Sequence, residues 1–418
     1  MSRSIPQNPF RHRAFALLWA GRLLTTIGTL TQSIAVGWQV YTVARLTHSV
    51  EQSSFLVGMV GLAQFLPMFA LALLAGETAD RYDRRKILLC CAGLQIICAA
   101  LFTFLALQHP PSLEALFVVA GLFGIARAFS MPASTSLAPM LVPAEILPKA
   151  IAWNTLAVQT GMVLGPWLGG VLCAFSPVWA NAAAGLMYVV AATTGIGLLL
   201  LPIDARPKHK GDPRLTMIRD GLKYLWTSKI VLGAISLDLF AVLLGGVTAL
   251  LPVYARDILV IGPGGFGLLR SGAALGGGLV TLVLSVRPIR RHAGKWMLLA
   301  VMVYGVATIL FAVSRHLWLS MAMLVVLGGA DSISVFVRQS LVQIVTPNHM
   351  RGRVAAVAGL FISASNEMGE FESGTAARFL GPVGSALFGG LGSIAVTLLW
   401  AKLFPALRKA DRLVAPEE

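Results

Sequence analysis

Eight ionisable side chains lie inside long apolar stretches of the chain, where charge is costly. They are Arg22, Arg127, Asp238, Asp331, Arg338, Glu367, Glu370 and Glu372. At bilayer depth a charged side chain costs about 2.5 kcal/mol or more on insertion scales, so such residues are functional candidates by default. Carboxylates and guanidinium groups at this depth predict proton or ion handling.

The spacing of these residues predicts pairs of opposite charge. Arg22 lies nine residues after Arg13, and Asp238 lies nine residues after Lys229. At 1.5 Å per residue, both side chains would sit about 13 Å from the same end of their helices. Arg338 falls at a similar depth, so we expect Asp238 to pair with Arg22 or Arg338 in at least one conformation. A static ion pair that only fixes helix packing is the alternative.

Three carboxylates follow one another closely near the end of the chain. Glu367 and Glu370 are three residues apart and share a helical face, whereas Glu372 points elsewhere. Two carboxylates in a poorly hydrated place disfavour double ionisation, which suits a proton carrier. The alternative is that Glu367 and Glu372 cap the helix or bridge to Arg378.

The composition indicates that these charges lie in a membrane protein. Of 418 residues, 56% are hydrophobic and 12% are charged, against about 25% charged in soluble domains. Runs that are apolar on all sides predict helices rather than barrel strands. The first run is too long for a signal peptide and contains Arg22, so we expect it to remain in the protein as a membrane span. The twelve expected spans are 14–42, 53–77, 86–107, 113–140, 150–175, 178–201, 230–254, 265–286, 296–314, 317–344, 354–378 and 382–404.

The basic residues are distributed unevenly between the loops. If the N-terminus is cytoplasmic, 25 of the 33 Lys and Arg residues fall on that side, and the opposite loops hold Arg45, Arg256 and Arg315. This asymmetry predicts a multi-pass membrane protein with both termini in the cytoplasm. The net charge of +15 is then explained by topology and by anionic lipid, with no nucleic-acid partner.

The breaks divide the chain into two sets of six spans. We expect an N-terminal bundle over 1–201, a linker over 202–229 and a C-terminal bundle over 230–418. In the linker, apolar residues recur at helical spacing, which predicts an amphipathic helix along the inner leaflet or a solvated connector. These residues are Leu215, Ile218, Leu222 and Leu225.

The two halves repeat at a constant offset of 204 residues. The matched pairs include Gly124 with Gly328, Ser130 with Ser334, Pro143 with Pro347 and Gly165 with Gly369. At this offset Arg127 coincides with Asp331, so the halves place opposite charges at equivalent positions and we expect the two to pair. Two related bundles predict an all-α membrane fold that works by alternating access.

A charged motif follows the second span. It runs GETADRYDRRK, with Gly76, Asp80, Arg81 and Arg84 at its fixed positions. It resembles the loop signature of the major facilitator superfamily, although Thr78 replaces a leucine and Asp83 a glycine. The resemblance implies a cytoplasmic latch between two pseudo-symmetric six-helix bundles.

A glycine motif lies in the fifth span. It comprises Gly161, Gly165, Pro166, Gly169 and Gly170, and it resembles the superfamily's antiporter signature G-x-x-x-G-P-x-x-G-G at every fixed position. Glycines four apart let another helix pack closely, and Gly272 and Gly276 offer a similar ridge in the eighth span. The motif favours export.

Further segments indicate a particular branch of the major facilitator superfamily. The stretches NPFRHRAFALLWAGRLLTTIG, ALLPVYARDIL and TPNHMRGRVAAV resemble bacterial proton-driven exporters that include enterobactin and macrolide efflux proteins. The resemblance implies a monomeric, proton-coupled exporter of an amphiphilic drug or siderophore in the bacterial inner membrane. An importer or lipid flippase of the same fold is the alternative, and a membrane enzyme or sensor would need a catalytic cluster or soluble domain that short loops do not supply.

Neither metal nor nucleotide chemistry is indicated. The seven histidines fall at loops or span ends, and the four cysteines lie in apolar runs without ligand spacing. No G-x-x-x-x-G-K-[ST] pattern occurs. We therefore expect no cofactor, and an ion gradient, of protons or of sodium, as the driving force.

Overall fold

The described chain is helical. The computed structural model describes residues 8–108, 110–202, 214–347 and 350–411, and within these ranges the regular elements are helices. Eleven of these helical segments are long and apolar enough to cross a membrane. The first half contains α1 (Arg13–Ala44), α2 (Val50–Arg81), α3 (Arg84–Leu107), α4 (Leu113–Leu137), α5 (Leu147–Phe175) and α6 (Pro177–Leu200). The second half contains α7 (Arg214–Thr227), α8 (Lys229–Leu244), α9 (Leu251–Val253), α10 (Gly262–Val286), α11 (Ala293–Val313), α12 (Leu317–Val345), α13 (Arg351–Leu403) and α14 (Pro405–Arg408).

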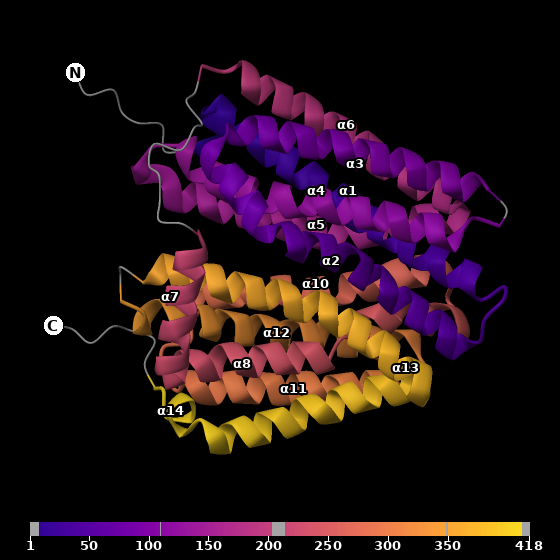
Figure 1. Cartoon of the computed structure of the whole chain (residues 1–418). Coiled ribbons are helices and arrows are strands. Elements are labelled where there is room, and N and C mark those ends of the chain that lie inside the picture. Colours follow the sequence, from indigo (N-terminus) through magenta and orange to yellow (C-terminus); the bar gives the residue numbers. More distant parts are fainter. Residues whose placement is uncertain (1–7, 109, 203–213, 348–349, 412–418) are drawn as a thin grey trace. The chain divides into compact units, whose positions relative to one another are not determined.

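The chain divides into two compact units. Unit 1 comprises residues 1–39 and 63–211, and unit 2 comprises residues 40–62 and 212–418. Within each unit the long helices lie side by side (Figure 1). The end of the α1–α2 hairpin therefore belongs to unit 2, and the expected bundle boundaries at 201 and 230 stay a prediction.

The last two expected spans form one helical segment with a sharp break. Gly381 within α13 has φ 73° and ψ 165°, and Pro382 follows it. The left-handed φ favours glycine, and proline removes a helical hydrogen bond. The break separates α13 into two legs at the place where the sequence predicts a turn between spans.

The seventh expected span is not one continuous helix, which corrects the prediction for 230–254. Helix α8 ends at Leu244, and Gly245 and Gly246 are not helical before a short 3-10 turn over Val247–Leu250. A π-helical turn over Tyr254–Ile258 follows α9. The Tyr304 hydroxyl donates to the Gly245 carbonyl at 2.7 Å. The tyrosine thereby satisfies a backbone group that the break leaves without its helical partner.

Unit 1 is held by close packing of α3 against α4 and α6. The small side chains of Ala79 in α2 and Ala133 in α4 pack with Ile87 and Cys91 of α3 and let these helices approach. Leu18, Leu137 and Leu198 form a second buried cluster that joins α1, α4 and α6. These contacts hold α1, α2, α3, α4 and α6 together within unit 1.

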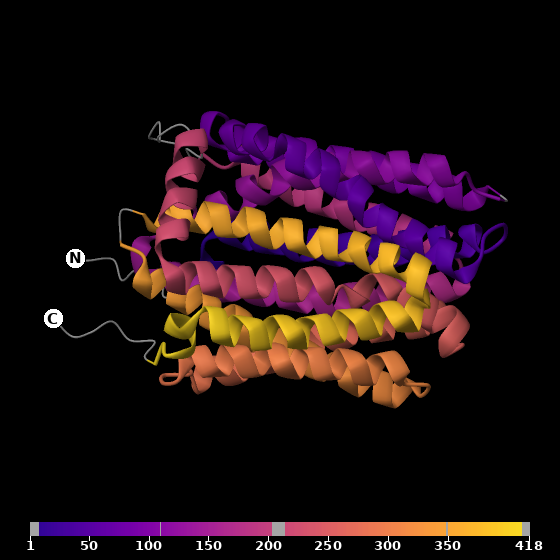
Figure 2. The same ribbon diagram turned by 60° about the horizontal axis from the view of Figure 1, so that its bottom comes forward.

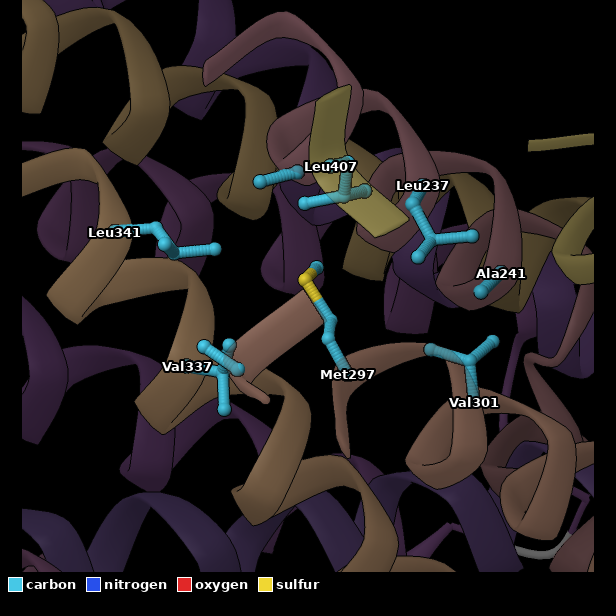
Figure 3. Packing of buried hydrophobic residues seen from close by; sticks show 9 residues of the cluster. Leu237, Ala241, Met297, Val301, Val337, Leu341 and Leu407 are labelled. Carbon is cyan, nitrogen blue, oxygen red and sulfur yellow. The ribbon is translucent and has the colours of Figure 1, made fainter. Parts of the chain in front are cut away.

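A core in unit 2 fixes the position of α8. Figure 3 shows Met297 of α11 between side chains of α8, α12 and α14, with its thioether directed toward Leu407. Leu237 and Ala241 of α8 lie in the same cluster. The core therefore orients α8 on either side of Asp238, which lies between these two residues in sequence.

The described part of the expected linker contains a helix whose apolar face packs on protein. Helix α7 contacts α13 and α8 and lies across the ends of the long helices (Figures 1 and 2). Ile218, Leu222 and Leu225 pack with Val354 and Val357. This side of α7 is therefore not free for the inner leaflet, while the Leu215 side chain and residues 203–213 lie outside the described part.

Candidate functional site

A buried ion pair joins α8 to α12 in unit 2. Arg338 Nη1 donates to Asp238 Oδ2, and the Ser334 hydroxyl donates to Asp238 Oδ1 at 3.4 Å. The side chains of Arg338 and Asp238 are 4% and 6% exposed. The predicted pairing of Asp238 with Arg338 is confirmed. Because desolvating two charges is expensive, the pair is a strong candidate for function.

Asp331 lies beside this pair. Asp331, Ser334 and Arg338 occur at intervals of three and four residues on α12, so they share one helical face. Asp331, Asp238, Ser334 and Tyr304 line a cavity of about 10 Å³, close to the room that one water molecule needs. The described residues give the Asp331 carboxylate no hydrogen-bond or ion-pair partner. Two carboxylates therefore line one small cavity, and among the described residues a single guanidinium, that of Arg338, pairs with one of them.

Arg22 and Arg127, the two candidate arginines of unit 1, each donate a hydrogen bond to a neutral side chain. Arg22 donates from Nη1 to the Ser134 hydroxyl of α4 at 3.2 Å. Arg127 donates from Nη1 to Gln64 Oε1 of α2 at 3.0 Å. Arg127 and Asp331 belong to different units, so their pairing stays a prediction.

Glu370 has a cationic partner that the sequence analysis does not name. Arg270 of α10 approaches Glu370 Oε1 with Nη2 at 3.3 Å, and its Nη1 donates to the Thr248 carbonyl at 3.3 Å. The Thr248 hydroxyl donates to the same carboxylate oxygen at 3.4 Å. Arg270 thus ties α13 to the interrupted segment after α8. The available signal was a single charge within the otherwise uncharged stretch 262–286.

The other two carboxylates of α13 differ in their surroundings. Glu367 lies three residues before Glu370 in the same helix, as expected. Glu372 accepts a hydrogen bond from the Ser373 hydroxyl at 3.3 Å. The Arg378 guanidinium lies over the Phe55 ring, 5.2 Å from its centroid, and among the described residues no ion pair joins it to Glu372. The described contacts therefore give no support to the alternative in which Glu372 bridges to Arg378.

A second polar contact missed from the sequence lies in unit 2. The Tyr41 hydroxyl donates to Asp257 Oδ2, and Arg45 Nε lies 3.5 Å from the same oxygen. Residues 40–44 of α1 are thereby joined to the π-helical turn over Tyr254–Ile258. The sequence pattern does not predict this contact, because Tyr41 and Asp257 are 216 residues apart.

In the charged loop motif, Asp83 caps a helix. Its Oδ1 accepts from the Arg85 backbone N–H at 2.9 Å and from Arg85 Nε at 3.1 Å, which is the role of an N-cap residue. Arg85 also donates to the carbonyls of Leu198 and Leu201 at the end of α6, at 3.3 and 3.0 Å. Partial burial opposes ionisation of Asp83, but the hydrogen bonds and charge of Arg85 outweigh it and lower the pKa of this carboxyl. The residue that departs from the family signature thus organises the loop.

The signature residues themselves make contacts within unit 1. Arg84 donates to the Ala79 carbonyl at 3.2 Å and to the Ser136 carbonyl at 3.3 Å, which joins the ends of α2 and α4. Arg81 pairs with Glu77 on an exposed face of α2. Gly76 and Asp80 lie in the last turns of the same helix. The predicted latch between bundles stays a prediction.

The glycine motif of α5 is a packing surface for α1. An ideal Cβ on Gly165 would lie 2.7 Å from Leu30 Cβ, and one on Gly169 would lie 2.8 Å from the Thr31 carbonyl oxygen. The Thr31 hydroxyl donates to the Gly165 carbonyl at 3.0 Å. Any side chain at these positions would separate the helices. Gly161 meets Thr26 in the same way, while Pro166 and Gly170 are buried.

A matching glycine contact exists in unit 2. An ideal Cβ on Gly276 of α10 would overlap the Val325 carbonyl of α12, and one on Gly328 would overlap the Ala273 carbonyl. Gly272 faces the Met321 side chain. The two helices consequently cross at backbone contact beside Asp331, which lies within one turn of Gly328.

Metal-binding groups do not assemble in the described ranges. No three His, Cys, Asp or Glu side chains there are placed to hold a metal ion, and the four cysteines are free. The acids and arginines of unit 2 form ion pairs with one another, as in Asp238–Arg338 and Glu370–Arg270.

Long apolar helices that carry buried charges and cross at glycines agree with a transporter of the major facilitator type. The chain belongs to the transmembrane secretion effector family, whose model matches residues 4–415. Solved transporters share the fold. The E. coli xylose transporter XylE in its inward-open conformation has a TM-score of 0.70 at 15% identity, with 94% of this chain and 96% of that chain covered. A POT family transporter has a TM-score of 0.76 at 13% identity, with 97% and 99% covered.

Curated relatives include exporters. The chain is 28% identical over 406 residues to the enterobactin exporter of Citrobacter koseri, covering 95% of this chain and 93% of the relative. It is also 28% identical over 411 residues to the enterobactin exporter of Salmonella typhi, with 95% and 94% covered. The family and these relatives are transporters rather than enzymes.

Proposed function

We propose that the chain is a proton-coupled exporter of amphiphilic small molecules, including siderophore-like compounds, in the bacterial inner membrane with both termini cytoplasmic. It works by alternating access between its two bundles. The relatives named as enterobactin exporters support the direction and the substrate class. The uneven loop charge of the sequence supports the orientation.

The proposal of proton coupling rests on a difference between two carboxylates, Asp238 and Asp331, in their pairing with a cation. Arg338 compensates Asp238, whereas the described residues place no cation on Asp331 in the same cavity. An isolated carboxylate inside a membrane is unfavourable, and like charges this close disfavour simultaneous ionisation. Binding one proton removes the excess charge. Asp331 is thus the proton acceptor of the proposed mechanism, and the Asp238–Arg338 pair is its electrostatic partner.

Protonation can bias a conformational equilibrium because it changes this balance. When Asp331 is protonated, Arg338 has one ionised carboxylate near it, that of Asp238. When Asp331 is ionised, Arg338 has two ionised carboxylates near it. The backbone contact of α10 with α12 at Gly276 and Gly328 places a rigid crossing next to the proton site. Different proton occupancy therefore favours different packing of α12, which couples the gradient to rocking.

The test uses purified protein in liposomes with an imposed pH gradient. Enterobactin movement and internal pH, reported by pyranine, are followed together. The unaltered chain moves enterobactin against its gradient while protons move the opposite way, and Asp331→Asn abolishes that proton flux. Asp411→Asn, at an exposed position, leaves both unchanged. Co-transport of proton and substrate in one direction, or full coupling in Asp331→Asn, would overturn the proposal.

A further inference from the structure

Unit 1 contains a cavity of its own. It has a volume of about 240 Å³ and lies between α1, α3, α4 and α6. Leu18, Leu88, Ala92 and Leu198 contribute apolar wall, and Arg22 and Gln95 contribute polar groups. The cavity is separate from the carboxylate cavity of unit 2, and no step proposed above uses it.

The Arg22 guanidinium in this cavity lacks an anion. Of its five N–H donors, one is taken by the neutral Ser134 hydroxyl, and within the described ranges no carboxylate pairs with it. Arg85 also lines the cavity but is occupied by Asp83 and by two carbonyls at the end of α6. Arg22 lies nine residues into α1, which corresponds to a depth of about 13 Å. Water entering the cavity would supply hydrogen bonds there but would leave the charge uncompensated.

Gln95 is a second polar group that faces the cavity. It is 3% exposed, and no described residue forms a hydrogen bond with its amide. Buried amides are normally hydrogen-bonded. A cation and an amide that share one apolar cavity, and both have unused donors, indicate a ligand with an acceptor-rich anionic end.

We propose that this cavity binds the anionic group of an amphiphile. A carboxylate or phosphate would accept the paired N–H groups of Arg22 and the amide N–H of Gln95, while an apolar ring or chain contacts the leucine wall. The volume lies below the roughly 300 to 1,000 Å³ of pockets that enclose drug-sized ligands, so it takes one substituted ring or the acidic end of a larger molecule. The inference rests on the proposed export function and narrows its substrates to acidic amphiphiles.

Binding is tested with three probes of one size and different charge. Full-length protein in phosphatidylcholine nanodiscs, without any gradient, is titrated calorimetrically with 2-naphthoate, its neutral amide and 2-naphthylmethylammonium. Naphthoate is expected to bind most tightly and the ammonium compound least. Equal affinity for naphthoate and its amide would overturn the proposal, because the cation would then contribute nothing.

Variants locate the site. Arg22→Gln should weaken naphthoate binding about tenfold or more, since a hydrogen bond to a charged group is lost, and should leave amide binding unchanged. Arg22→Lys keeps the charge and retains part of the preference, which guards against a folding defect in Arg22→Gln. Gln95→Leu weakens binding to a smaller extent. Arg290→Gln removes an equal charge from an exposed loop and serves as the matched control. Unchanged naphthoate affinity in Arg22→Gln would refute the site.

Two further arms separate the sources of the anion and the two proposals. If phosphatidylglycerol in the nanodiscs displaces naphthoate from the unaltered chain, the bound anion is a lipid headgroup; if it does not, it is a free amphiphile. Either result requires the Arg22 site. Because binding is measured without a gradient, charge-selective binding in a chain that fails to couple protons would reject the proposed function alone. Coupled transport without charge-selective binding would reject this inference alone.

Discussion

Asp238 and Asp331 line one small cavity in unit 2, yet among the described residues only Asp238 forms an ion pair with an arginine. Their environments differ because Arg338 lies one helical turn beyond Ser334 and reaches across to α8, whereas Asp331 lies on the same helix as Arg338. A seven-residue separation along α12 places both charges on one face. The geometry assigns different roles to two residues of the same type.

Removal of one member of the Asp238–Arg338 pair should destabilise unit 2 more than removal of both. Asp238→Asn or Arg338→Gln leaves a buried group without its partner, at a cost of about 3 to 5 kcal/mol. The double change Asp238→Leu with Arg338→Met should recover most of that loss and should still lack proton coupling. Thermal unfolding of the detergent-solubilised protein, beside liposome transport, measures both effects. Equal stability of all variants would contradict a buried pair.

Loss of Arg270 should loosen the interrupted segment after α8. The pair is about a quarter exposed, with side chains at 23% and 26%, so its contribution is discounted to about 1 kcal/mol or less. Hydrogen exchange at Val247–Leu250 is expected to rise in Arg270→Gln, because the Thr248 carbonyl loses the guanidinium N–H that donates to it. Arg287→Gln, near the other end of α10, serves as the control. A uniform rise across unit 2 would indicate general unfolding instead.

Gly276→Ala should destabilise the protein, whereas Gly278→Ala should not. A methyl group on Gly276 meets the Val325 carbonyl, while the space beside Gly278 is open. Overpacking costs about 1 to 3 kcal/mol, and alanine in an open helical position is favourable relative to glycine. The unfolding midpoints of the two variants test this contrast. Similar midpoints would show that the α10–α12 crossing tolerates separation.

Asp83 should contribute stability that depends on pH. Its pKa is lowered in the folded chain, so its contribution is complete above the ordinary value of about 3.9 and is lost as the pH falls through the lowered folded value. Asp83→Asn should remove this part of the acid dependence of unfolding. Glu77→Gln, on an exposed face, should leave the profile unchanged, and an unaltered profile in Asp83→Asn would contradict the cap.

Much of the architecture is predictable from local pattern. Long apolar runs determine helices in a membrane because every backbone group must be satisfied internally, and the expected spans agree with the described helices except at Gly245–Gly246. At that break the Tyr304 hydroxyl of α11 donates to the Gly245 carbonyl, a contact between two helices that local pattern does not specify. Glycines in sequence are compatible with either a continuous or an interrupted helix.

The sequence specifies which charged residues lie in the apolar helices, but the choice of their ion-pair partners has a different physical origin. The sequence by itself determined that acids and arginines lie in apolar helices, that the halves repeat, and that Asp238 has a cation at matching depth. Only the tertiary structure decided that Arg338 forms the ion pair with Asp238 and that Arg270 forms the one with Glu370. The tertiary structure also decided that Arg22 lines a cavity. Helical periodicity specifies which residues share a face, because it acts over a few residues. The choice among distant partners depends on helix rotation and crossing, which are determined by packing throughout a bundle.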